Sequence, residues 1–171
     1  MLLKWKPELL HLSIGKVLAM RGLVPTSVLV CCLCATLSSQ TQEDAVMTSM
    51  DHYVSSFQAR DLDGVLASWD LPAEIIYEDL HATFATRDDL AAFYDQALTA
   101  LPPDYGHSEL DKISVKLLSE RIALVGWEFG RYRRSGEEYF RAAAMYKLKR
   151  TESGWKMISM LTYDSDAYVA F

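Results

Sequence analysis

The chain has few cysteines, and all three lie close together near the N-terminus, at Cys31, Cys32 and Cys34. The remaining length of the sequence therefore offers no disulfide, no thiolate nucleophile and no cysteine metal site. Glycine-rich phosphate loops, nucleophile elbows and strips of alternating basic and aromatic residues are also missing. The histidines are widely scattered and form no metal-ligand pattern. We therefore predict neither a metal nor another cofactor.

Positive charge is scarce in the first half of the folded part and gathers after Lys112, while the whole chain carries a net charge of -6. A net acidic protein repels phosphates, which argues against nucleic acid as a partner. The late basic residues allow two interpretations. They could form an anion-binding sheet face, or they could be the solvated face of strands, because Arg131/Arg133 and Lys147/Lys149 alternate at period two. We favour the solvated face.

An uncharged apolar segment, GLVPTSVLVCCLCATL, occupies residues 22–37. It is short for a membrane-spanning helix, which needs about 20 residues, and it suits the apolar region of a secretory signal peptide better. We therefore divide the chain into a leader, residues 1–42, and a folded domain, residues 43–171. A start at Met20 would make a tidier signal peptide of a secreted or periplasmic protein. A start at Met47 would remove the leader and leave a cytoplasmic protein, and a membrane is a partner only if the leader is retained.

The folded part begins with helical patterns. Apolar residues recur at three- and four-residue spacing from Val46 to Phe57, which predicts an amphipathic helix. Asp61 is a predicted N-cap of a short second helix that ends near Trp69, and Thr86 is a predicted N-cap of a third helix that runs to Leu101. Between these two helices, the apolar pattern of residues 73–80 predicts one strand.

The rest of the chain predicts four long strands joined by short hairpin turns, which make an antiparallel meander. Three helices followed by such a sheet predict an α+β domain, with the helices packed on one face of a curved antiparallel or mixed β-sheet. The run of small residues Ala142, Ala143 and Ala144 stands among large aromatic residues. Small side chains opposite large ones leave space, so we expect a cavity that takes an apolar ligand.

This order of elements resembles the nuclear transport factor 2-like superfamily, with its cone-shaped fold, over residues 46–168. HYVSSFQARDLDGVLASW is similar to the first two helices of its ketosteroid isomerase members, IIYEDL to a strand that ends in an aspartate, and DDLAAFYDQAL and SMLTYDSDAY to the third helix and the last strand. The superfamily also includes SnoaL-like cyclases and scytalone dehydratase. The resemblance implies a homodimer and a pocket for a small apolar ligand or substrate.

The resemblance also implies roles for individual residues. Asp79 matches the general base, Tyr53 matches the tyrosine that donates a hydrogen bond to the oxyanion, and Tyr94 matches a supporting tyrosine. The second oxyanion donor of ketosteroid isomerase is replaced here by Ala144 or Met145, neither of which can donate a hydrogen bond. Loss of one such donor typically lowers kcat by about 10²–10³, so a full ketosteroid isomerase is not expected.

His81 follows Asp79 by two residues, so the two could share one face of a strand and form an acid-base dyad, but we favour the interpretation of His81 as a loop residue. The other residues that we expect around the substrate are Phe57, Trp69, Tyr77, Tyr94, Trp127, Ala144, Tyr146 and Tyr163. Two functions remain open. One is a cofactor-independent isomerase, cyclase or dehydratase that acts by proton transfer on an apolar carbonyl compound, and the other is a non-catalytic module for ligand binding or dimerisation.

Overall fold

The computed structural model describes residues 27–171, with side chains from residue 41 onward. It contains three helices, α1 (Ser27–Ala59), α2 (Leu62–Ala67) and α3 (Arg87–Thr99). Most of the predicted leader, residues 1–42, lies outside the described residues. No helix of the described part is both long enough and apolar enough to cross a membrane.

The six strands are β1 (Trp69–Tyr77), β2 (Leu80–Phe84), β3 (Tyr105–Ser119), β4 (Ile122–Arg133), β5 (Glu138–Thr151) and β6 (Gly154–Tyr163). They form one sheet in the order β2-β1-β6-β5-β4-β3. Consecutive strands from β3 to β6 pair antiparallel, as predicted, while β1 pairs parallel with β6. The sheet is therefore mixed, and the prediction of an α+β fold with three helices on one sheet face is confirmed.

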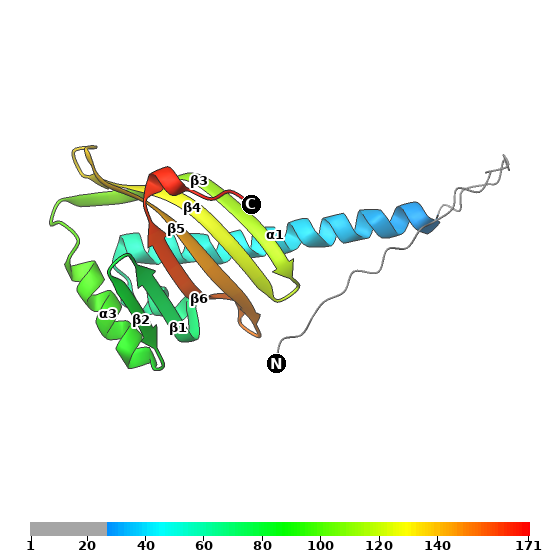
Figure 1. Ribbon diagram of the computed structural model, residues 1–171, viewed down its shortest axis with the longest axis horizontal. Helices are drawn as coiled ribbons and strands as arrows, with labels where there is room; N and C mark the ends of the chain where they lie inside the picture. The colour runs from blue at the N-terminus through cyan, green and yellow to red at the C-terminus, as the bar shows by residue number, and fades with distance from the viewer. Residues whose placement is uncertain (1–26) are drawn as a thin grey trace, which may run out of the picture.

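Helix α1 lies behind the sheet in Figure 1, and α3 lies beside β2. Buried side chains of both helices join one hydrophobic core with one face of the sheet, which we call the inner face. The hydrophobic core fills the space between the helices and this face. It combines Val46 and Met50 of α1 and Leu90 of α3 with Val125 and Leu148 of the central strands, each at most 1% exposed. The stripe of apolar residues predicted from Val46 onward is thus the side of α1 that packs on the sheet.

The strand predicted at residues 73–80 is wrong in one respect, because the chain turns back within it. Tyr77 pairs directly with Leu80, so Glu78 and Asp79 form a two-residue turn between β1 and β2. The residues after this turn make an extra strand that the sequence pattern did not predict. Helix α2 also ends earlier than predicted, at Ala67, and Trp69 is the first residue of β1.

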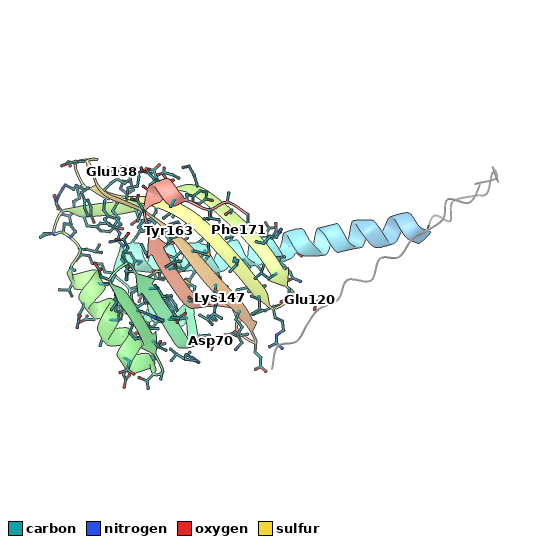
Figure 2. All side chains as sticks on the ribbon, viewed as in Figure 1. Asp70, Glu120, Glu138, Lys147, Tyr163 and Phe171 are labelled. Atoms are coloured by element: carbon teal, nitrogen blue, oxygen red, sulfur yellow. The ribbon has the colours of Figure 1, made fainter. Side chains whose placement is uncertain are left out.

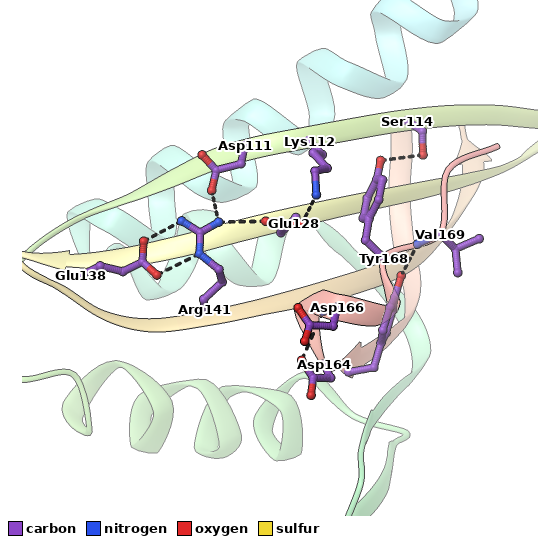
Figure 3. A network of polar contacts seen from close by, with 11 residues as sticks. Asp111, Lys112, Ser114, Glu128, Glu138, Arg141, Asp164, Asp166, Tyr168 and Val169 are labelled. Atoms are coloured by element: carbon purple, nitrogen blue, oxygen red, sulfur yellow. Dashed lines mark hydrogen bonds and ion pairs between the residues drawn. The ribbon is translucent and has the colours of Figure 1, made fainter.

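The other face of the sheet, which we call the outer face, carries charge and the C-terminal segment. Lys147 and Tyr163 lie on this face, which Figure 2 turns toward the viewer. After the 3-10 helix η1 (Ser165–Ala167), the chain crosses the outer face, and the Tyr168 hydroxyl donates a hydrogen bond to Ser114 Oγ at 3.2 Å (Figure 3). Gly126 lies beneath this segment, where an added Cβ would come within 2.7 Å of the Val169 carbonyl oxygen.

Both predicted helix caps are present, and the cap of α3 gives a test of the fold. The Thr86 Oγ1 accepts a hydrogen bond from the backbone N–H of Asp89 at 3.2 Å. We expect Thr86→Ala to lower the free energy of unfolding by about 1 kcal/mol, because an N–H of the first turn loses its acceptor. Thr99→Ala, at the exposed last residue of the same helix, is the matched control. Equal shifts of the urea midpoint in the two variants would contradict a stabilising cap.

Candidate functional site

A cavity of about 340 Å³ lies between the inner face of the sheet and helices α1 and α3. Its walls are rich in aromatic side chains that come from five different elements, α1, β1, α3, β4 and β5. We call it the aromatic cavity, and the sequence-predicted residues that line it are Tyr53, Phe57, Tyr77, Tyr94, Trp127 and Tyr146. These six side chains are far apart in the chain, and the structure brings them together around one space.

The aromatic cavity has a buried floor and a more exposed mouth. Tyr53, Tyr94, Trp127 and Tyr146 are all at most 7% exposed, and the rings of Trp127 and Tyr146 meet edge to face at 4.8 Å. Tyr77 and the exposed Phe140, at 36% and 41%, also line the cavity. A ligand would therefore enter past these two rings and lie with its far end against the buried ones.

The phenols at the floor form a hydrogen-bonded group. The hydroxyl oxygens of Tyr53 and Tyr94 are 3.2 Å apart. Burial raises the pKa of Tyr53 to about 12 and raises the pKa values of Tyr94 and Tyr146 well above the ordinary 10. All three hydroxyls are therefore neutral near pH 7. They can donate hydrogen bonds to a ligand or accept them from it, but they cannot remove a proton from it.

Arg131 also lines the aromatic cavity, which corrects the interpretation of this residue as part of a solvated strand face. The register of the sheet explains the difference. Arg131 lies two and four residues after Phe129 and Trp127 on β4, and side chains at that spacing share one face of a strand. Counting from Trp127 would have placed Arg131 inside. Lys147 and Lys149, which follow the inward-facing Tyr146 by odd numbers of residues, do lie on the outer face as predicted.

Three rings surround the guanidinium group of Arg131. Its central carbon lies 5.2 Å from the ring centre of Phe57, 5.5 Å from that of Phe129 and 5.1 Å from that of Phe140. These distances fit cation–π contacts, which favour a guanidinium over the ring faces. Phe129 and Phe140 line the cavity as well, and neither was among the residues predicted for the site.

Two N–H groups of the lining residues are buried without a hydrogen-bond partner in the described part of the chain. They are Nε1 of Trp127 and Nε of Arg131. Buried donors are nearly always paired in folded proteins, and each unpaired one calls for an explanation. Both donors belong to residues that line the aromatic cavity, but the nitrogens themselves are covered by neighbouring atoms.

Three residues predicted for the substrate pocket lie elsewhere. Trp69 and Ala144 are buried in the core beside the cavity, with the Trp69 ring centre 6.0 Å from that of Tyr94. Tyr163 is opposite Ala143 in the sheet, which places it on the outer face, where its hydroxyl accepts a hydrogen bond from the backbone N–H of Val169.

Asp79 lies in the exposed turn between β1 and β2 and does not line the aromatic cavity. It lines a second, more open depression, which we call the turn hollow and which also contains Glu78 and Tyr163. Tyr77, Phe140 and Thr162 border both spaces. The mouth of the aromatic cavity therefore opens beside the turn that carries Asp79.

The expectation that His81 shares a strand face with Asp79 is wrong, because the turn separates them. His81 pairs with Ile76 in β1, next to the cavity-lining Tyr77 but on the outer face. Its Nε2 lies 2.6 Å from a carboxylate oxygen of Glu74, and this hydrogen bond holds the pKa of Glu74 below its ordinary value. The polar pair on this edge of the sheet is thus His81 with Glu74.

Within residues 27–171, no group of three or more His, Cys, Asp or Glu side chains is arranged to hold a metal ion. The polar groups that line the aromatic cavity are hydroxyls, an indole N–H and the guanidinium of Arg131. They can orient and stabilise oxygen atoms of a ligand by hydrogen bonds and by one positive charge.

Several solved structures share this fold. An NTF2-like protein with a cystatin-like fold from Novosphingobium aromaticivorans superimposes with a TM-score of 0.66 at 21% identity, covering 79% of this chain and 89% of that one. A Streptomyces avermitilis protein, provisionally assigned as a dehydratase of the NTF2-like family, has a TM-score of 0.57 at 14% identity, covering 72% and 95%. Another Novosphingobium aromaticivorans protein, provisionally assigned as an aromatic ring hydroxylase, has a TM-score of 0.59 at 15% identity, covering 77% and 94%.

At these identities, the likeness shows a shared fold. No curated protein matches the chain. A family model described as NTF2-like protein (DUF6841) matches residues 42–165, which is most of the sequence and includes the whole sheet, α2, α3 and the second half of α1. The predicted resemblance is therefore confirmed, and the chain belongs to the NTF2-like family DUF6841.

Proposed function

We propose that the protein binds a small, mostly apolar molecule in the aromatic cavity, without a cofactor. The observation that carries this proposal is the composition of the cavity: about 340 Å³ lined by aromatic rings, with a few polar groups among them. Ligand sites typically have volumes of about 300–1,000 Å³ and this balance of apolar and polar lining. The provisional enzyme names of two similar structures are consistent with a small-molecule pocket.

Binding is favoured over catalysis because the aromatic cavity holds no general base among its described residues. No carboxylate or imidazole lines it, and the raised pKa values of Tyr53, Tyr94 and Tyr146 keep these phenols protonated. A proton-transfer enzyme needs a base within hydrogen-bond reach of the proton that it removes.

A proton-transfer enzyme, such as an isomerase, cyclase or dehydratase acting on an apolar carbonyl compound, is the second candidate. It is favoured by the turn hollow, which carries Asp79 and shares Tyr77, Phe140 and Thr162 with the cavity mouth. A substrate held by Tyr53 at the floor would have to extend to the mouth to meet this carboxylate. Asp79 would then act on the outer end of the ligand.

A homodimer formed through the outer face is also proposed. Leu161, Val169 and Phe171 are between 36% and 43% exposed, and Leu161 and the C-terminal segment lie on this face. Covering such apolar side chains favours association. We therefore expect light scattering to give the mass of two chains at micromolar concentration, and a mass of one chain across the accessible range would refute the dimer.

The binding proposal is tested by filling the aromatic cavity from α3. Ala97 lines the cavity, whereas Ala92 is exposed on the same helix and does not. We expect Ala97→Phe to reduce the small molecule retained through purification to roughly a tenth or less, because the added ring occupies the ligand's space. Ala92→Phe, the matched control, retains the same molecule as the unmodified protein. The measurement is unbiased mass spectrometry of what each protein releases on denaturation, and equal release by both variants would contradict binding in the cavity.

Asp79→Asn separates the two candidate functions. If the protein only binds its ligand, Asp79→Asn keeps the ligand affinity within about twofold of the unmodified protein, because Asp79 lies outside the aromatic cavity. In heavy water, neither the variant nor the unmodified protein then speeds deuterium incorporation into a carbonyl ligand. This is the outcome that we expect. Exchange by the unmodified protein that falls by about 10²–10⁴ in Asp79→Asn would instead identify the aspartate as a general base.

A further inference from the structure

Arg131 is the one charged residue among the described side chains that line the aromatic cavity. It extends from β4, and its backbone pairs with Ser108 on one side and Phe140 on the other, both of which also line the cavity. A positive charge thus lies in a space that otherwise has an apolar, aromatic wall. Placing a charge there costs free energy unless something compensates for it.

Two other arginines of the same hairpin, Arg133 and Arg141, have carboxylate partners, and Arg131 has none in the described part of the chain. Arg133 lies 2.7 Å from a carboxylate oxygen of Asp104. Arg141 pairs with Asp111, Glu128 and Glu138 on the outer face (Figure 3). Arg131 forms no ion pair, and its buried Nε has no hydrogen-bond acceptor.

The rings around Arg131 compensate for only part of its lost hydration. Phe57, Phe129 and Phe140 lie 5.1 to 5.5 Å from the guanidinium carbon and stabilise the charge through their ring faces. A guanidinium that contacts rings through its planar faces keeps its N–H groups, which point outward in the plane, available for acceptors. A carboxylate matches that edge, because its two oxygens accept two parallel N–H bonds.

We propose that Arg131 binds the carboxylate of a flat, apolar carboxylic acid whose ring system fills the aromatic cavity. This inference rests on the proposed binding function and names the class of ligand. The charge comes from Arg131, and the ring contacts come from Tyr53, Trp127 and Tyr146. Because no acidic side chain lines the cavity, an amine ligand would meet a like charge without compensation, so the same site rejects cations.

The test compares two probes of nearly the same shape, 2-naphthoate and 2-naphthamide, by isothermal titration calorimetry at pH 7. We expect the full-length protein to bind the carboxylate at least about 10-fold more tightly than the amide. Arg131→Met should weaken 2-naphthoate binding by roughly 10- to 100-fold, as expected when a hydrogen-bonded charged partner is lost, and should leave 2-naphthamide within about twofold. Arg133→Met is the matched control, since Arg133 lies two residues along the same strand and does not line the cavity, and it should bind both probes like the unmodified protein.

The outcomes distinguish this inference from the proposed function. Equal or tighter binding of the amide by the unmodified protein would overturn the role of Arg131 while leaving a ligand-binding cavity. A preference for 2-naphthoate over 2-naphthamide that persists in Arg131→Met would also overturn the role of Arg131 and leave the ligand-binding cavity in place. If neither probe binds, the result counts against the proposed binding function and against the inference that the ligand is a carboxylic acid. If Arg131→Met does not fold, Arg131→Lys keeps the charge without the planar fork, and it should retain part of the preference for 2-naphthoate.

Discussion

The register between β4 and β5 decides which side chains meet beneath the helices. Trp127 lies opposite Ala144 and Phe129 lies opposite Ala142, so each large ring on one strand faces a small side chain on the next. Both rings line the aromatic cavity and neither alanine does, so the expectation that the run of alanines opens the cavity is wrong. A slip of one residue in β5 would turn Ala142, Ala144 and Tyr146 to the outer face, because successive residues of a strand alternate. The inward position of Tyr146 and the pairing of Arg131 with Phe140 in the cavity wall depend on this alignment.

The same alternation gives neighbouring arginines opposite surroundings. Arg141 lies opposite Gly130, on the outer face, where Asp111, Glu128 and Glu138 neutralise it and Lys112 also pairs with Glu128 (Figure 3). Arg131, opposite Phe140, lies on the inner face with aromatic rings as its neighbours. Composition alone therefore says little about how basic residues act in this protein. What matters is the face of the sheet that each one occupies, because the outer face supplies carboxylates and the inner face supplies rings.

Local signals in the sequence were sufficient for most of the fold. Asp61 and Thr86 cap the two helices that they were predicted to begin, since a cap depends on residues only a few positions apart. The four long strands were predicted from their length and from the turns between them. Strand β2 was missed because it has only five residues and because the turn before it, Glu78-Asp79, lacks the glycine or asparagine that usually marks a two-residue hairpin turn. The family resemblance also followed from short stretches of sequence, and the match over residues 42–165 confirms it.

The candidate site was predictable only where a side chain's face could be inferred from its neighbours. Tyr53 belongs to the predicted apolar stripe of α1 and also matched the oxyanion tyrosine of the family resemblance, and both signals place it on the side of the cavity. The places of Asp79 and His81 depended on where one short turn falls, and the turn put the aspartate at the mouth and the histidine on the outer face. Arg131 was misplaced because period two alone does not say which face is inside. Its true position changes the chemistry of the cavity, since neutral phenols and one cation, with no base beside them, suit the binding of an oxygen anion better than the removal of a proton. Solved structures with this fold carry different provisional names, so the side chains that reach the inner face, rather than the fold, decide what this protein can bind.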